Sequence, residues 1–96
     1  PEAAKEIIRT FLAETQKNVI QIKEALSQKE MKALCGIAHK MLPTFTMINA
    51  HEALPSLQYL ENKRDENILT EEAEAHARKI IEMAENMIQK SQENAM

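Results

Sequence analysis

Apolar residues recur every three or four positions along most of this chain, and that spacing restricts the fold more than any other feature. The first segment carries the repeat at Ile8, Phe11, Leu12, Thr15, Val19, Ile22 and Leu26. A three-four repeat places such side chains on one face of a helix. The pattern returns in three later segments, so the sequence predicts an all-helical protein.

The composition agrees with this fold class. One glycine and three prolines leave little material for the tight turns of β-hairpins, which disfavours an all-β fold. Phe11, Phe45 and Tyr59 are the only aromatic residues, so the core is expected to consist of Leu, Ile, Ala and Met. A chain of 96 residues supports one domain, and residues 1–96 are interpreted as a single unit.

Four helices are expected, and local signals suggest their ends. Their approximate ranges are 2–26, 28–48, 52–63 and 71–89. Ser27 and Glu30 match a capping box for the second helix, and Asn49 suits a left-handed C-cap after it. Pro55 falls in the first turn of the third helix, and Thr70 is expected to cap the fourth. Short connections between such helices predict an antiparallel up-down four-helix bundle.

Charge and cysteine content disfavour several classes of function. The net charge is −3 at pH 7 and the pI is about 5.6, whereas nucleic-acid binding needs a basic face, so no nucleic-acid partner is expected. The single Cys35 cannot form an internal disulfide and suits a reducing compartment. No apolar run approaches the ~20 residues that span a bilayer. We expect a cytoplasmic domain without direct membrane contact. The start at Pro1 favours a piece of a larger protein, and a membrane-bound sensor kinase is compatible with this expectation.

His39 is the most chemically suggestive residue of the second predicted helix. At about 100° per residue it lies roughly a quarter-turn from Ala38, so it stands at the border between the apolar stripe and solvent. Gly36, the only glycine, precedes it by three residues, and Pro43 follows it by four. Gly costs a helix about 1 kcal/mol relative to Ala, and Pro43 removes the hydrogen bond to the His39 carbonyl. Helix-weakening residues on both sides of one histidine indicate that access to the imidazole was favoured over local stability.

Three interpretations of His39 stay open on the residues alone. It can be a surface histidine without a role, flanked by a glycine that serves close packing and a tolerated kink. It can bind a metal together with Cys35, one helical turn earlier, but two ligands do not make a site, and no metal is expected. It can be a nucleophile towards phosphorus, because an imidazole near neutral pH has an unprotonated nitrogen. His51 and His76 are interpreted as structural.

One known family is similar to this chain around the histidine. The phosphoacceptor helix of histidine-containing phosphotransfer (HPt) domains resembles the segment His39-Lys40-Met41-Leu42-Pro43-Thr44 with the later pair Asn49-Ala50. The family pattern is roughly H-x-L-K-G, then a small residue and, several positions later, G-A. HPt domains are four-helix bundles with the active histidine on the second helix, so the resemblance covers nearly the whole chain. Two positions depart from the pattern, since the common Lys is Leu42 here and the following Gly is Pro43.

The resemblance implies a phosphorelay intermediate of two-component signal transduction, within a bacterial hybrid histidine kinase. His39 is then the residue that accepts a phosphoryl group from the aspartyl phosphate of a response-regulator receiver domain and passes it to another receiver, as a phosphohistidine. The receiver supplies Mg²⁺, so neither a cofactor of this domain nor autonomous kinase activity is expected. The residues expected to contact the receiver are Lys32, Gly36, Lys40, Pro43 and Thr46. Among them Lys40 is a candidate replacement for the missing family lysine.

A second class of function also stays open, a non-catalytic helical-bundle interaction or scaffold module. It explains the four helices equally well but gives no reason for Gly36 and Pro43 to flank His39. The dimerisation-and-phosphorylation helices of kinases likewise expose a histidine, but they complete four helices by dimerising. This chain supplies four helices itself, and we therefore expect a monomer.

Overall fold

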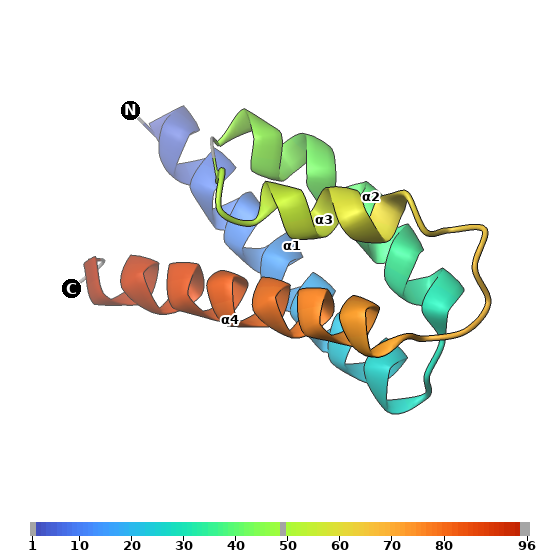
Figure 1. Ribbon diagram of the computed structural model, residues 1–96. Helices are drawn as coiled ribbons and strands as arrows, with labels where there is room; N and C mark the ends of the chain where they lie inside the picture. The colour runs from blue at the N-terminus through green and yellow to red at the C-terminus, as the bar shows by residue number, and fades with distance from the viewer. Residues whose placement is uncertain (1, 49, 95–96) are drawn as a thin grey trace.

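The structure, a computed structural model, describes the backbone of residues 2–48 and 50–94 and the side chains of residues 5–48 and 50–91. Within these ranges it is all-helical, and none of its helices is both long enough and apolar enough to cross a membrane. The helices are α1 (Glu2–Ser27), α2 (Met31–Met47), α3 (Leu54–Glu61) and α4 (Glu71–Asn94). The all-helical prediction is confirmed, and the arrangement is compatible with a helical bundle (Figure 1).

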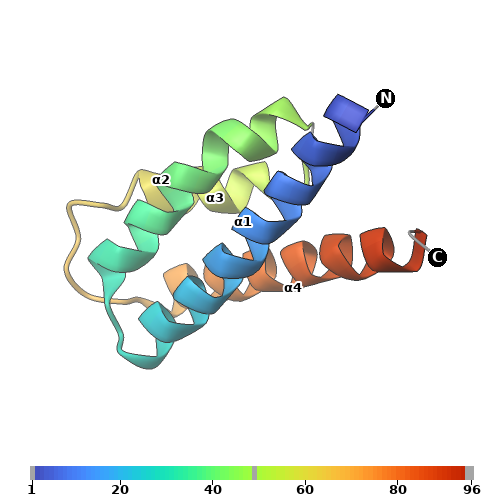
Figure 2. The same cartoon turned by 180° about the vertical axis from the view of Figure 1, so that it is seen from behind.

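The four helices form a ring in which each packs mainly against two others. α1 packs against α2 and α4, and α3 packs against the same two helices. Figures 1 and 2 show α1 beginning and α4 ending towards one end of the molecule, while the connections at 28–30 and 62–70 lie at the other end. The molecule is elongated, with extents of 44 × 21 × 18 Å.

The core runs along the inside of this ring and is mostly aliphatic, as the composition predicts. Its largest fully buried apolar side chains are Ile22, Met31, Leu34, Met41, Phe45, Leu57, Leu60 and Ile80. Phe11 of α1 packs against Phe45 of α2 with ring centroids 5.5 Å apart. Burial of apolar surface contributes about 25 cal/mol per Å², so the buried stripe of α2 fixes the rotation of that helix. The opposite face of α2 is thereby turned to solvent.

The capping box predicted at Ser27 is wrong. Ser27 is the last residue of α1, and Glu30 is the N-cap residue of α2 without a side-chain hydrogen bond. Lys29 adopts a left-handed φ of 56°. The amides of Lys29 and Glu30 donate to the carbonyls of Leu26 and Ala25 at 3.2 and 2.9 Å. These two bonds form a Schellman motif, so α1 continues through Ser27 and α2 begins later than the predicted residue 28.

The predicted range of the third helix, 52–63, is too long at both ends. Residues 51–53 form a turn, and the helix proper begins at Leu54 with Pro55 in its first turn, as expected. Proline is tolerated there because its missing N–H has no helical acceptor in any case. The C-cap expected at Asn49 lies outside the described residues.

α4 begins where the sequence predicts and ends later than residue 89. The hydroxyl of Thr70 accepts a hydrogen bond from the amide of Ala73 at 3.1 Å, which is the expected N-cap contact. Acidic side chains fill the first turn, where they interact favourably with the positive end of the helix dipole. The helix continues to Asn94.

Candidate functional site

The outward face of α2 carries all the residues that the sequence analysis singled out as a site. We call this surface the α2 outer face. It comprises the exposed residues Lys32, Gly36, His39, Lys40, Pro43, Thr46 and Met47. α2 continues as a helix through Pro43. The predicted site residues therefore share one continuous surface that begins near the N-terminal end of α2 and ends at its last residue.

Glu61, the last residue of α3, is a partner of His39 that the sequence analysis missed. Its Oε1 lies 2.9 Å from Nδ1 of His39. The His39 side chain is 56% exposed and that of Glu61 is 29% exposed. Because a carboxylate only accepts hydrogen bonds, a neutral imidazole in this contact carries its proton on Nδ1 and leaves Nε2 unprotonated. The contact thus sets both the tautomer and the orientation of the ring.

The packing of α3 explains how Glu61 reaches α2. Leu57 precedes Glu61 by four residues, so the two side chains lie on neighbouring parts of one helix face. Leu57 is fully buried in the core. Glu61 therefore emerges at the edge of the buried face, beside α2. Neither helical periodicity nor a short motif links it to His39, which is 22 residues away in sequence.

Two lysines on the α2 outer face are available to an anion. Lys32 and Lys40 are exposed, and neither belongs to an ion pair among the described residues. Lys40 follows His39 directly, and Lys32 lies seven residues earlier on nearly the same side of the helix. Leu42, at the position of the family lysine, packs against the core and supplies no charge.

Gly36 has no packing role among the described residues. A Cβ placed at this position meets no heavy atom within 4 Å, so the space above Gly36 is open. The interpretation that this glycine serves close helix packing within the chain is therefore wrong. Near the other end of the site, the hydroxyl of Thr46 donates to the carbonyl of Leu42 at 2.7 Å, a bond back to the preceding turn.

A groove borders the α2 outer face on the side of α1. It has a volume of about 310 Å³, and its walls include Gly36 and Lys40 of α2 and Gln21 and Glu24 of α1. On the side of α3, by contrast, His39 contacts Glu61. The groove therefore opens beside Gly36 and Lys40, on the side of α2 that faces α1.

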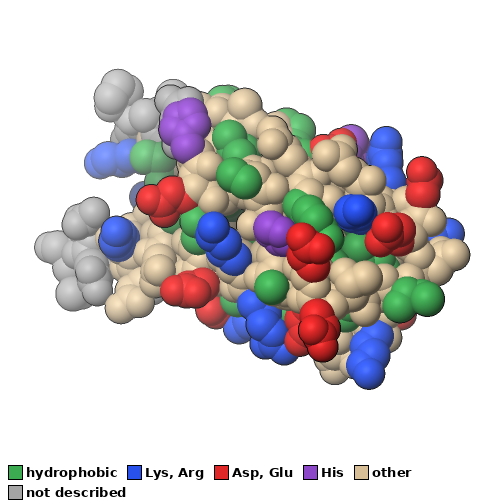
Figure 3. Space-filling model, viewed as in Figure 1, with side chains coloured by type: hydrophobic (Ala, Val, Ile, Leu, Met, Phe, Trp, Pro, Cys, Tyr) green, Lys and Arg blue, Asp and Glu red, His purple; other side chains and the backbone are tan. Residues whose placement is uncertain are grey.

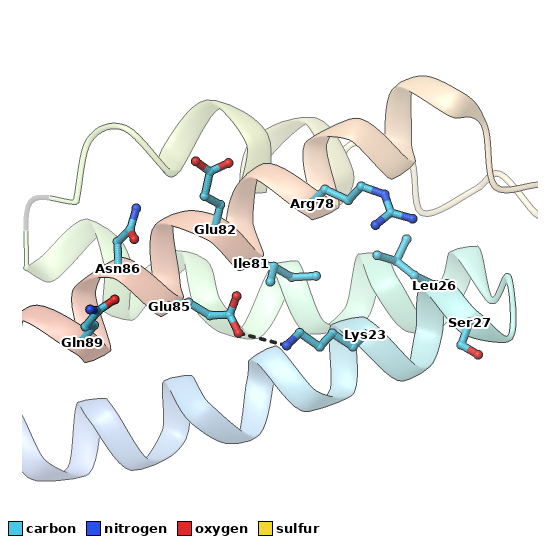
Figure 4. A pocket seen from close by; sticks show the side chains of 9 residues that line it. All are labelled: Lys23, Leu26, Ser27, Arg78, Ile81, Glu82, Glu85, Asn86 and Gln89. Carbon is cyan, nitrogen blue, oxygen red and sulfur yellow. Dashed lines mark hydrogen bonds and ion pairs between the residues drawn. The ribbon is translucent and has the colours of Figure 1, made fainter.

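A larger groove of about 810 Å³ lies between α1 and α4, away from His39 (Figure 4). Its two cationic side chains already have acidic partners. Lys23 pairs with Glu85 at 2.9 Å, and Arg78 pairs with Glu74 at 2.6 Å. Figure 3 shows acidic and basic side chains interspersed over the face of α3 and α4, so that face presents no patch of one sign. The described residues that line this groove include no histidine, and its cations are already paired with carboxylates.

The other histidines lie in different surroundings. The ring of His76 stacks on Tyr59 with centroids 4.2 Å apart, and its Nδ1 lies 2.9 Å from the hydroxyl oxygen of Ser56. Ser56 is only 1% exposed, so its hydroxyl is not accessible as a nucleophile. His51 is exposed in the turn before α3.

Cys35 lies one turn before His39 but belongs to the core. It is fully buried. Burial and the nearby Glu66 raise the pKa of its thiol, and Arg64 partly offsets this increase. A buried neutral thiol is a poor metal ligand, because the thiolate is the form that coordinates. Among the described residues, no group of three or more His, Cys, Asp or Glu side chains is placed to hold a metal ion.

No protein-family model matches the chain. No curated protein and no solved structure matches it either. Function is therefore inferred from the residues around His39 and their geometry.

Proposed function

We propose that this domain is a phosphorelay intermediate in which His39 carries the phosphoryl group, and that its helices form an antiparallel up-down bundle. The contact between Glu61 and Nδ1 of His39 is the observation that carries the functional proposal. It leaves Nε2 as the unprotonated nitrogen of a side chain that is 56% exposed. The common end at which α1 begins and α4 ends supports the up-down order of the helices (Figure 2).

In the proposed reaction, Nε2 of His39 attacks the phosphorus of an aspartyl phosphate on a response-regulator receiver domain. A P–N bond forms in line while the P–O bond breaks, and the electron pair of that bond leaves with the aspartate carboxylate. Nδ1 keeps its hydrogen, so no general base is required. The ring becomes positively charged, and the carboxylate of Glu61 stabilises this charge where it develops.

The phosphoryl group then passes to an aspartate of a second receiver by the reverse chemistry. Lys32 and Lys40 are the cations of the α2 outer face that can balance the charge of a phosphorylated His39. Mg²⁺ belongs to the acidic site of the receiver. The domain therefore contributes an oriented nucleophile and a binding surface, without nucleotide, metal or kinase activity of its own.

Access to the imidazole fits the same proposal. Gly36 has open space above it, and Pro43 is exposed on the other side of His39. Residues without long side chains allow another protein to come close to the reacting nitrogen. The groove beside Gly36 and Lys40 extends this accessible surface towards α1.

The setting that we propose is two-component signal transduction in the cytoplasm, with the domain acting as a monomeric part of a bacterial hybrid histidine kinase. This setting rests on the resemblance of the His39 segment to HPt domains.

The test is phosphoryl transfer from receiver domains charged with acetyl phosphate in the presence of Mg²⁺. The wild-type domain is compared with His39→Gln and with His51→Gln, which removes a different exposed histidine. We expect an acid-labile, alkali-stable phosphate on the wild type and on His51→Gln, and none on His39→Gln. Label retained by His39→Gln contradicts the proposal. Absence of label across a broad panel of receivers favours the scaffold alternative.

A further inference from the structure

α3 is held by specific side-chain contacts on two of its sides. Towards α2, Glu61 meets His39, and towards α4, Ser56 and Tyr59 meet His76. We propose that His76 is a positioning residue, which holds α3 against α4 and thereby sets where the Glu61 carboxylate meets the His39 ring. The kinetic consequence of this inference rests on the proposed function, whereas its structural part does not.

α3 has few other means of fixing its position. It contains eight residues, fewer than the ~12–15 that an isolated helix needs for marginal stability. Its N-cap residue, Ala53, makes no side-chain capping bond. Leu57 and Leu60 anchor α3 in the core. These two leucines lie within one turn, so they hold an eight-residue helix against rotation less firmly than the longer buried stripe holds α2.

His76 supplies the directional contacts that the apolar core lacks. Its Nδ1 lies 2.9 Å from Oγ of Ser56, and the hydroxyl of Ser56 is almost fully buried. A buried hydroxyl needs a hydrogen-bond partner, so this contact restricts how far α3 can rotate. The His76 ring also stacks on Tyr59 with an interplanar angle of 25°. One side chain of α4 thus holds two residues of α3 that lie nearly one turn apart.

The contacts of His76 with Ser56 and Tyr59 form a joint between α3 and α4, and Tyr59 extends this joint to the beginning of α4. Glu72 and Thr70 lie near the hydroxyl of Tyr59, and the Lys63 ammonium lies 5.5 Å from the centre of its ring. Burial and the nearby Glu72 carboxylate raise the pKa of the Tyr59 hydroxyl. Thr70 is also the N-cap of α4. The joint between α3 and α4 is therefore built on the first two turns of α4.

Helix geometry links this joint to the candidate site. Glu61 follows Ser56 by five residues, which places it about 140° further round α3. The contacts to α4 and to α2 therefore lie on different sides of the same short helix, and a rotation of α3 displaces the Glu61 carboxylate. Hydrogen bonds between nitrogen and oxygen span only about 2.7–3.2 Å. The 2.9 Å contact with His39 is thus sensitive to small movements of α3.

Nitrogen NMR of the uniformly ¹⁵N-labelled domain tests this inference, because the Nδ1 and Nε2 shifts of His39 distinguish its tautomers. Glu61→Ala provides the reference spectrum for loss of the contact. We expect His76→Ala to shift the His39 nitrogens towards that reference, and Ser56→Ala to shift them part of the way. Phosphoryl transfer should slow in the same order, by no more than it slows in Glu61→Ala.

Ile80→Val is the control for general loosening of the fold. It removes one methylene from the core of α4 and lowers stability without removing a polar contact to α3. Unchanged His39 signals in folded His76→Ala, or an equal shift in Ile80→Val, overturn the positioning role. If His76→Ala does not fold, Ser56→Ala decides by the same spectrum. The spectrum needs no phosphate, so failure of transfer in every variant counts against the proposed function alone.

Discussion

The carboxylate of Glu61 lies 2.9 Å from Nδ1 of His39 and joins the last residue of α3 to the middle of α2. A surface histidine without such a partner is free to exchange its proton between two ring nitrogens. The carboxylate favours the tautomer with the hydrogen on Nδ1, so Nε2 keeps its lone pair. The contact therefore orients the ring and leaves one nitrogen ready to react.

Replacing Glu61 by Gln keeps the shape of the side chain and removes its charge. We expect phosphoryl transfer to slow by about tenfold to a hundredfold, by analogy with the loss of carboxylates that orient metal-binding histidines. The measurement is the initial rate with one charged receiver. Glu66→Gln is the matched control, because it removes the same charge from an exposed carboxylate that pairs with Lys63. Equal slowing in both variants would attribute the effect to net charge.

Replacing Gly36 by Ala should stabilise the domain. The site is exposed and a Cβ meets no atom within 4 Å, so the gain is about 1 kcal/mol in the free energy of unfolding. Urea unfolding measures it, and Ala33→Gly, at another exposed position of α2, should lower stability by a similar amount. A Cβ near the approach to His39 should also slow phosphoryl transfer. Lower stability of Gly36→Ala would contradict the open space.

Replacing Pro43 by Ala restores an amide that can donate to the His39 carbonyl. Stability should rise, by at most about 3 kcal/mol, because proline is unfavourable by that amount in a helix interior. Urea unfolding and exchange of the new amide measure the change. If Pro43 serves access, the stabilised variant should transfer phosphate more slowly. Greater stability with an unchanged transfer rate would assign the proline to a tolerated helix defect.

The raised pKa of Cys35 predicts a loss of stability in alkaline solution. The buried thiol of the folded state keeps its proton at a pH where the unfolded chain, with an ordinary pKa of about 8.5, has lost it. In that range the unfolded state binds fewer protons, so the free energy of unfolding falls as pH rises. Urea midpoints between pH 7 and 10 should decline less steeply in Cys35→Ala. Tyr59 contributes in the same direction and is common to both proteins. Equal slopes would contradict burial of the thiol.

The sequence predicts helices from side-chain spacing and predicts their ends less well. α1 and α4 follow from long three-four repeats, and Thr70 from a local rule that the structure obeys. The N-cap predicted at Ser27 is wrong because the pattern Ser-x-x-Glu does not show whether the preceding helix has ended. Here Lys29 accepts a left-handed conformation, which ends α1 after Ser27 instead. The residue at which α1 ends therefore depends on how α1 and α2 pack.

The candidate site likewise contains residues that the sequence predicts and one contact that it does not. His39 and the other residues of the α2 outer face follow from the position of the apolar stripe on one helix. Glu61 does not, because its contact with His39 arises when α3 packs beside α2. The open space above Gly36 is likewise a property of the packed molecule. The spacing of residues in the sequence does not show whether another helix packs against this glycine.

The position of the phosphoryl group on the His39 ring tests the proposed reaction most directly. The ¹⁵N-labelled domain is charged by a phosphorylated receiver and observed by phosphorus and nitrogen NMR. We expect phosphorus coupled to Nε2 of His39, with the hydrogen retained on Nδ1 beside Glu61. Coupling to Nδ1, or phosphate on any other residue, would contradict the proposed reaction.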